Sequence, residues 1–172
     1  MARLALLTAA LLAWLAMAGP ARAQQSEADV FVAEAILAYE DKRFDDALKL
    51  LQQALQIDGE SVDALYYTGL VQVARRRLDL AVEPFEKARR LAPGDLTIAF
   101  QLGVVYFGQE QYDKAAPLLT QVFNAEPRTD PVLEGQATQL IVRLAPRLAE
   151  FNQRPDERTG GAVGQIMLAI PL

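Results

Sequence analysis

The sequence predicts an all-α fold built from stacked helical hairpins, and three observations lead to that fold class. Small, large apolar and helix-ending residues recur with one period of 34 residues through the middle of the chain. Apolar side chains between those positions recur every three to four residues, which is the spacing of one helix face. Cysteine and histidine are both absent, which removes disulfides and the commonest metal ligands as ways of holding a fold together.

Residues 1–23 have the pattern of a secretory signal peptide. A short basic start is followed by an apolar run from Leu4 to Ala18 and by small residues at Ala21 and Ala23, the order in which a signal sequence is arranged. The run of 15 residues is shorter than the roughly 20 that a membrane-spanning helix needs. We therefore expect cleavage before Gln24 and export, most simply to the periplasm. A retained membrane anchor is the alternative.

The charge balance argues against a nucleic-acid-binding protein and gives no support to an enzyme. The formal net charge is −5, and it becomes −7 without residues 1–23, which hold two arginines and no acid. Phosphates require a basic surface. Without histidine or cysteine the usual catalytic base, thiol nucleophile and zinc ligands are missing, and no other constellation points to a reaction. We expect no catalytic residues, no cofactor and no metal.

Five columns of residues define the repeat. The first column holds small residues that we expect to face the alanines of the third, so that the two helices of each hairpin pack closely. The second would fill the space beneath the turn, and the fifth ends each second helix. In order, the columns are Ala35, Gly69 and Gly103; Phe44, Leu78 and Tyr112; Ala47, Ala81 and Ala115; Leu51, Phe85 and Leu119; and Gly59, Pro93 and Pro127.

The pattern predicts six helices and then a seventh that covers the last repeat. Pro84 and Pro117 fall inside second helices, where we interpret them as tolerated kinks. In residues 130–152 a capping helix is expected to begin at Pro131 and to lay its apolar side chains on the last hairpin, with Pro146 bending or breaking it. The six repeat helices are predicted at residues 28–41, 45–57, 62–75, 79–91, 96–108 and 113–124.

This period, with its small, small, large and proline columns, resembles the tetratricopeptide repeat (TPR) family over residues 28–61, 62–95 and 96–129. The resemblance implies a right-handed solenoid of three helix-turn-helix repeats. Glu34, Ala99 and Val122 depart from the family's usual apolar, large and small residues. The outer repeats are therefore less typical than the middle one, as is expected of terminal units.

Members of the family bind extended peptides along the concave face formed by the first helix of each hairpin. Carried over by repeat position, that face would bind a protein or peptide partner through nine apolar or aromatic residues, although each of them could also be core. Lysine, arginine and asparagine are missing there, which excludes the members that clamp a partner's terminal carboxylate. The nine residues are Val32, Ile36, Tyr39, Tyr66, Leu70, Val73, Phe100, Val104 and Phe107.

Residues 153–172 are polar and rich in glycine, and from Gln165 to Leu172 they become apolar and uncharged. This segment could fold back on the solenoid, form the first strand of a longer protein, or be a disordered or membrane-seeking tail. In one version of the first possibility, the tail occupies the concave groove until a partner displaces it. The tail residues that would do so are Ile166, Met167, Leu168 and Ile170.

The sequence therefore favours an exported interaction scaffold that acts in cell-envelope assembly, secretion or export. The alternative is the N-terminal periplasmic arm of an outer-membrane β-barrel, with residues 160–172 entering the first strand. Arg75, Arg76 and Arg77 form a basic run at the second hairpin's turn. It is either simply solvated or a contact for an acidic partner or anionic lipid.

Overall fold

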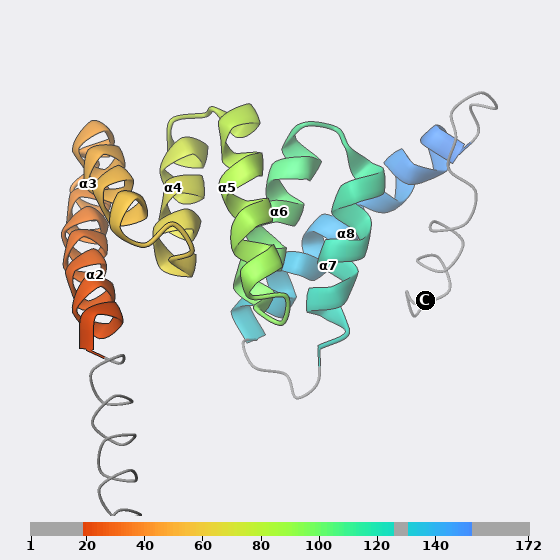
Figure 1. Cartoon of the computed structure of the whole chain (residues 1–172). Coiled ribbons are helices and arrows are strands. Elements are labelled where there is room, and N and C mark those ends of the chain that lie inside the picture. The colour runs from red at the N-terminus through yellow and green to blue at the C-terminus, as the bar shows by residue number, and fades with distance from the viewer. Residues whose placement is uncertain (1–18, 126–130, 153–172) are drawn as a thin grey trace, which may run out of the picture. The chain divides into compact units, whose positions relative to one another are not determined.

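The computed structural model describes the backbone of residues 19–125 and 131–152, and the side chains of residues 27–125 and 131–147 (Figure 1). Within these ranges the chain forms seven helices and no strand, which confirms the predicted all-α fold class. Most of the predicted signal peptide and the whole tail, residues 153–172, lie outside the described residues. The helices are α2 (Gly19–Glu40), α3 (Phe44–Ile57), α4 (Val62–Ala74), α5 (Leu78–Leu91), α6 (Leu96–Gly108), α7 (Tyr112–Phe123) and α8 (Pro131–Asn152).

Helix α2 is the element whose bounds differ most from the prediction. It was expected to begin near residue 28, but it begins at Gly19 and runs across the predicted cleavage point before Gln24. Pro20 lies in its first turn, where the missing amide hydrogen costs no helical bond. The alanines that follow are the strongest helix formers, so the helix extends through the segment that was predicted to be removed.

The chain divides between Tyr67 and Thr68, inside α4, into two compact units. In the described residues, the first unit holds the α2–α3 hairpin and the start of α4, and the second holds the rest of α4 with α5 to α8. In the second unit α6 packs against α5 and α7, and α8 packs against α7 and also touches α6. Figure 1 shows α6 between α5 and α7, with α8 crossing behind them.

The glycine column allows each hairpin to close, but its partner is not the one predicted. A Cβ atom added to Gly69 would lie 2.6 Å from the Phe85 ring, and one added to Gly103 would lie 2.9 Å from Cδ2 of Leu119. Carbon atoms that are not bonded pack at about 3.5–4.0 Å. The atoms nearest each glycine therefore belong to the large column of the repeat, instead of the alanines that we expected there. The alanines of the third column are themselves fully buried.

Each hairpin turns through a residue with positive φ, and these residues form a further 34-residue column that the sequence did not reveal. Lys42, Arg76 and Glu110 have φ of 61°, 60° and 62°. The amide after each donates to a carbonyl five residues back, as Arg43 N–H does to the Ala38 oxygen at 2.8 Å. The residue with positive φ itself donates to a carbonyl three residues back. This pair of bonds is the Schellman motif, which usually has glycine at that position.

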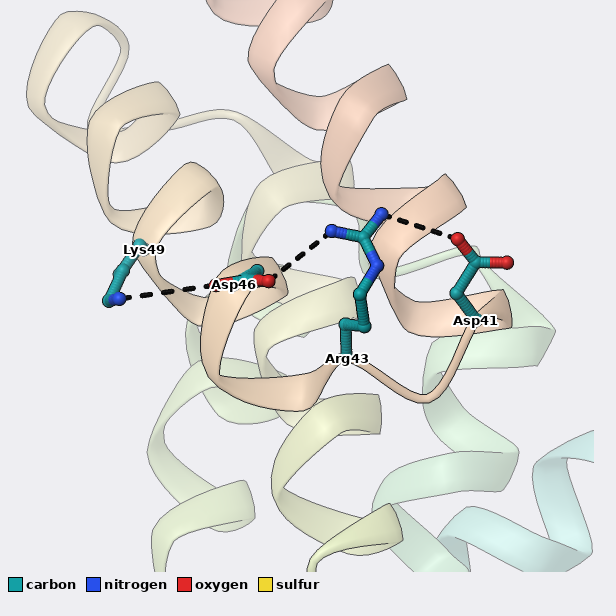
Figure 2. Close-up of polar contacts among 4 residues, drawn as sticks. All are labelled: Asp41, Arg43, Asp46 and Lys49. Carbon is teal, nitrogen blue, oxygen red and sulfur yellow. Dashed lines mark hydrogen bonds and ion pairs between the residues drawn. The ribbon is translucent and has the colours of Figure 1, made fainter.

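The first turn also carries a chain of polar contacts on its surface (Figure 2). Arg43 pairs with Asp41 at 3.2 Å and with Asp46 at 3.3 Å, and Lys49 approaches Asp46 at 3.9 Å. The hydrogen bond to Asp41, followed by that to Asp46, raises the pKa of the Arg43 guanidinium above its ordinary value. All four side chains are solvated, so these contacts fix the local geometry and contribute little to stability.

Helix α8 begins a fourth repeat and does not complete it. Ala137 lies 34 residues after Gly103 and is fully buried, as are the equivalent positions before it. Leu144 is buried where a fourth turn residue would lie, and the helix continues past it and past Pro146 to Asn152. Gln136 and Gln139 are exposed at positions where α6 has the buried Leu102 and Val105. This polar outer face is what a helix at the end of a stack requires.

Candidate functional site

The nine predicted first-helix residues fall into two groups by burial. Val32 and Phe100 are 5% and 6% exposed, so both belong to the core. The other seven are neither buried nor largely exposed, which leaves part of each apolar side chain in contact with water. These half-buried residues are Ile36, Tyr39, Tyr66, Leu70, Val73, Val104 and Phe107, and we call them the first-helix residues.

In the first unit the aromatic first-helix residues form part of a ring cluster. Tyr39 contacts Phe44 with 6.0 Å between ring centroids, and Tyr67 with 6.2 Å. Tyr66 meets Tyr67 edge to face at 5.5 Å. Burial, and then the charges of Asp63 and Glu40, raise the pKa of the Tyr67 hydroxyl. Our sequence analysis did not single out Tyr67, although it follows Tyr66 directly and joins the two other tyrosines.

In the second unit, Phe100, Val104 and Phe107 share one side of α6. At 100° per residue they lie within about 60° of one another around the helix axis. The Phe107 ring packs edge to face on Tyr112, with 5.6 Å between centroids. Tyr112 begins α7, so the residue that was predicted to fill the space beneath the turn also holds Phe107 in place. This side of α6 carries no charged side chain.

A second concavity lies on the other side of α6, where the sequence analysis predicted nothing. Leu102 and Tyr106 are turned about 180–260° from Phe100 around the axis of α6. They form the floor of an open groove of about 670 Å³ between α5 and α7. We call this the α5–α7 groove. Pro93, Pro117 and Leu118 complete its apolar lining, and its charged lining consists of Glu86, Arg89, Arg90, Asp113 and Lys114.

Tyr106 is the centre of the groove's polar contacts. The residue is only 4% exposed, and its hydroxyl donates a hydrogen bond to Oε1 of Glu86. Nζ of Lys114 lies 5.2 Å from the centroid of its ring, within the range of a cation–π contact. Burial, and then the hydrogen bond and charge of Glu86, raise the pKa of Tyr106 well above its ordinary value. The hydroxyl therefore stays protonated and occupies the Glu86 carboxylate.

Arg89 is held in a defined position by neutral partners. Its Nη1 donates to Oε1 of Gln121 at 2.9 Å, and Nε2 of Gln121 donates to the Pro93 carbonyl at 3.4 Å. Among the described residues, ion pairs occur at the α2–α3 turn, and neither Arg89, Arg90 nor Lys114 pairs with a carboxylate. The groove thus holds three cations, opposed by Asp113 and by a Glu86 already bound to Tyr106.

The basic run at the second turn has a structural role that we did not foresee. Arg76 is the residue with positive φ, and Arg77 precedes the first residue of α5. Both side chains are exposed, as the solvated interpretation of this run expects. A contact of the run with an acidic partner or with lipid stays a prediction.

Within the described part of the chain, no three candidate ligands come together as a metal site would require. Nor does any helix in that part combine the length and apolar character that crossing a membrane demands.

Comparisons with known proteins agree with this fold. The tetratricopeptide repeat family profile matches residues 32–95. No curated protein matches the sequence.

Among solved structures, the Sgt2 TPR domain from Aspergillus fumigatus is 20% identical with a TM-score of 0.64, over 79% of this chain and 88% of that one. The Arabidopsis OM64 TPR domain is 15% identical with a TM-score of 0.63, over 72% and 98%. The Yersinia enterocolitica type III secretion chaperone SycD, in complex with a peptide of the translocator YopD, is 16% identical with a TM-score of 0.60, over 71% and 92%. Residues 32–95 therefore carry tetratricopeptide repeats, and the described helices have the fold of this repeat family.

Proposed function

We propose that this chain is a non-catalytic TPR module that binds an extended segment of a partner polypeptide through its first-helix residues. One observation carries the proposal: seven apolar or aromatic side chains at matching repeat positions are left partly in water. Half-buried aromatic residues make good anchors, because a partner completes their burial at a low cost in side-chain entropy. The complex of SycD with a peptide is a precedent for this use of the fold.

The chemistry of these residues indicates what the partner must offer. None of the seven is charged, so neither charge pairing nor a carboxylate clamp can select the ligand there. Burial of apolar surface contributes about 25 cal/mol per Å², and it rewards leucine, phenylalanine or similar side chains on the partner. We therefore expect an extended ligand with apolar side chains, whose affinity depends only weakly on salt.

A labelled peptide of alternating leucine and serine tests this proposal directly by fluorescence anisotropy with the full chain. Replacing Phe107 by alanine should weaken binding about tenfold, the effect of losing one aromatic anchor. Val142→Ala provides the matched control, because Val142 is 59% exposed on α8 and lies outside the first-helix residues. Equal affinities for the two variants, or no binding by the unchanged chain, would contradict the proposal.

Export to the cell envelope is a further part of the proposal, and it depends on the signal-like pattern of residues 1–23. Expression in a bacterium, followed by fractionation and N-terminal sequencing, should yield a periplasmic chain that begins at Gln24. A cytoplasmic chain that retains residues 1–23 would refute this part and leave the binding proposal untouched. The alternative, an arm of an outer-membrane β-barrel, depends on residues 160–172, outside the described residues, and stays a prediction.

A further inference from the structure

We propose that the α5–α7 groove is a second binding site, which takes an acidic extended segment of a partner polypeptide. It lies on the other side of α6 from Phe100, Val104 and Phe107, and it shares no residue with the first-helix residues. The proposal concerns the second unit alone, since every lining residue belongs to α5, α6, α7 or the loop that follows α5.

The charges of the groove select the ligand. Arg89 and Arg90 end α5 on one wall, and Lys114 lies in the first turn of α7 on the other. No described carboxylate pairs with any of the three. Unpaired cations on both walls are unexpected in a chain whose net charge is −5. They complement carboxylates placed along a segment that lies between the walls.

Two of these cations are prepared for such a ligand. Gln121 holds one guanidinium nitrogen of Arg89 at 2.9 Å, which orients the side chain and leaves its remaining N–H donors for a carboxylate. Tyr106 supports Lys114 through its ring, and its hydroxyl engages Glu86. The carboxylate that would otherwise repel an acidic ligand is therefore already hydrogen-bonded.

The floor of the groove favours a polypeptide over other polyanions. Leu102, Pro117 and Leu118 present apolar surface between the cations, which suits a segment that alternates acidic and apolar side chains. A nucleic acid would instead need an extended basic surface, and the net acidity of the chain opposes one. We therefore assign the groove to an acidic peptide.

Fluorescence anisotropy with the full chain tests this assignment. The probe is a labelled peptide of alternating glutamate and leucine, compared with peptides of equal length in which glutamine or lysine replaces glutamate. The glutamate peptide should bind, its affinity should fall as salt is raised, and the lysine peptide should bind at least about tenfold more weakly. No binding of the glutamate peptide, or equal binding of the lysine peptide, would overturn the assignment.

Matched variants separate the groove from the net charge of the protein. Arg90→Glu should weaken the glutamate peptide about tenfold, as expected for a lost charge-assisted contact. Arg143→Glu makes the same change at an exposed arginine of α8 and should change binding less than about twofold. Lys114→Gln gives a second, milder reading, and circular dichroism verifies the fold of each variant. Equal losses in Arg90→Glu and Arg143→Glu would show attraction to overall charge alone and refute the site.

One further variant keeps the two proposals apart. Phe107→Ala should leave the affinity for the glutamate peptide unchanged, although it weakens the leucine–serine peptide. Loss of glutamate-peptide binding in Phe107→Ala would place that peptide on the first-helix residues and contradict a separate site. Displacement of the peptide by an equally charged single-stranded DNA would show recognition of charge alone, and would also refute the assignment.

Discussion

The two sides of helix α6 differ in chemistry although one short segment builds both. One side carries Phe100, Val104 and Phe107 and no charge, whereas the other lies under a groove with charged walls. The apolar side follows from the repeat, because each of its residues has counterparts 34 residues earlier. The charged side depends on how α5 and α7 flank the helix. One repeat can therefore offer two surfaces of opposite character, of which only the first is visible in the periodic pattern.

The largest expected effect comes from separating the packing of this region from its surfaces. Leu119 is fully buried and faces Gly103, so Leu119→Ala should lower the free energy of unfolding by about 3 kcal/mol. Leu118→Ala, at the floor of the groove, should cost less and should also weaken the glutamate peptide. Urea unfolding of both variants measures the difference. A larger loss in Leu118→Ala would show that the groove floor, and not the Gly103 contact, holds α6 and α7 together.

A smaller effect is expected from the hydroxyl of Tyr106. Tyr106→Phe removes its hydrogen bond to Glu86 and should cost about 1 kcal/mol, because the carboxylate loses its partner. The freed carboxylate should also weaken the glutamate peptide and leave the leucine–serine peptide unaffected. Urea unfolding and anisotropy test the two parts. A variant that binds the glutamate peptide more tightly would contradict the role given to Tyr106.

The raised pKa of Tyr106 predicts how stability responds to alkali. The folded chain holds the proton more tightly than the unfolded one, whose tyrosine pKa is 10.0. The stability that this difference contributes is therefore complete below pH 10.0 and is lost as the pH rises through the folded pKa. Tyr106→Phe should flatten that part of the decline, measured by urea unfolding at a series of pH values. The remaining slope would include Tyr67, whose pKa is also raised.

The smallest effect should come from the turns, which touch neither side of α6. Arg76→Gly places glycine where φ is 60° and should raise the free energy of unfolding by about 0.5–1 kcal/mol, because glycine has no Cβ clash there. Ala74→Gly, at the end of α4, should lower it by a similar amount. Thermal unfolding compares the two. A destabilised Arg76→Gly would indicate that the arginine side chain makes a contact worth more than the backbone strain.

What could be predicted from the sequence is what the period encodes. Gly69 and Phe85 recur in register with Gly103 and Leu119, so the hairpins and their helices followed directly. The turn column could not be seen, since lysine, arginine and glutamate do not announce a positive φ. Ala137 did continue the 34-residue column, and comparing it with Gly103 would have identified α8 as a partial fourth repeat.

The candidate sites were predicted less completely for a physical reason. A repeat position tells which side of its own helix a residue occupies, and this placed Val104 and Phe107 together. It does not tell how deeply a neighbouring helix covers the residue, so Phe100 was predicted as surface although it belongs to the core. The α5–α7 groove needs Arg90, Tyr106 and Lys114 from three helices at unrelated spacings, and no local pattern brings them together.

The most direct test of two independent surfaces on α6 is simultaneous binding. The chain is saturated with unlabelled glutamate–leucine peptide, and the affinity for the labelled leucine–serine peptide is then measured by anisotropy. Independent surfaces predict the same dissociation constant with and without the first peptide. Displacement of one peptide by the other would show that both occupy one surface, and it would contradict the assignment of the two sides of α6 to different ligands.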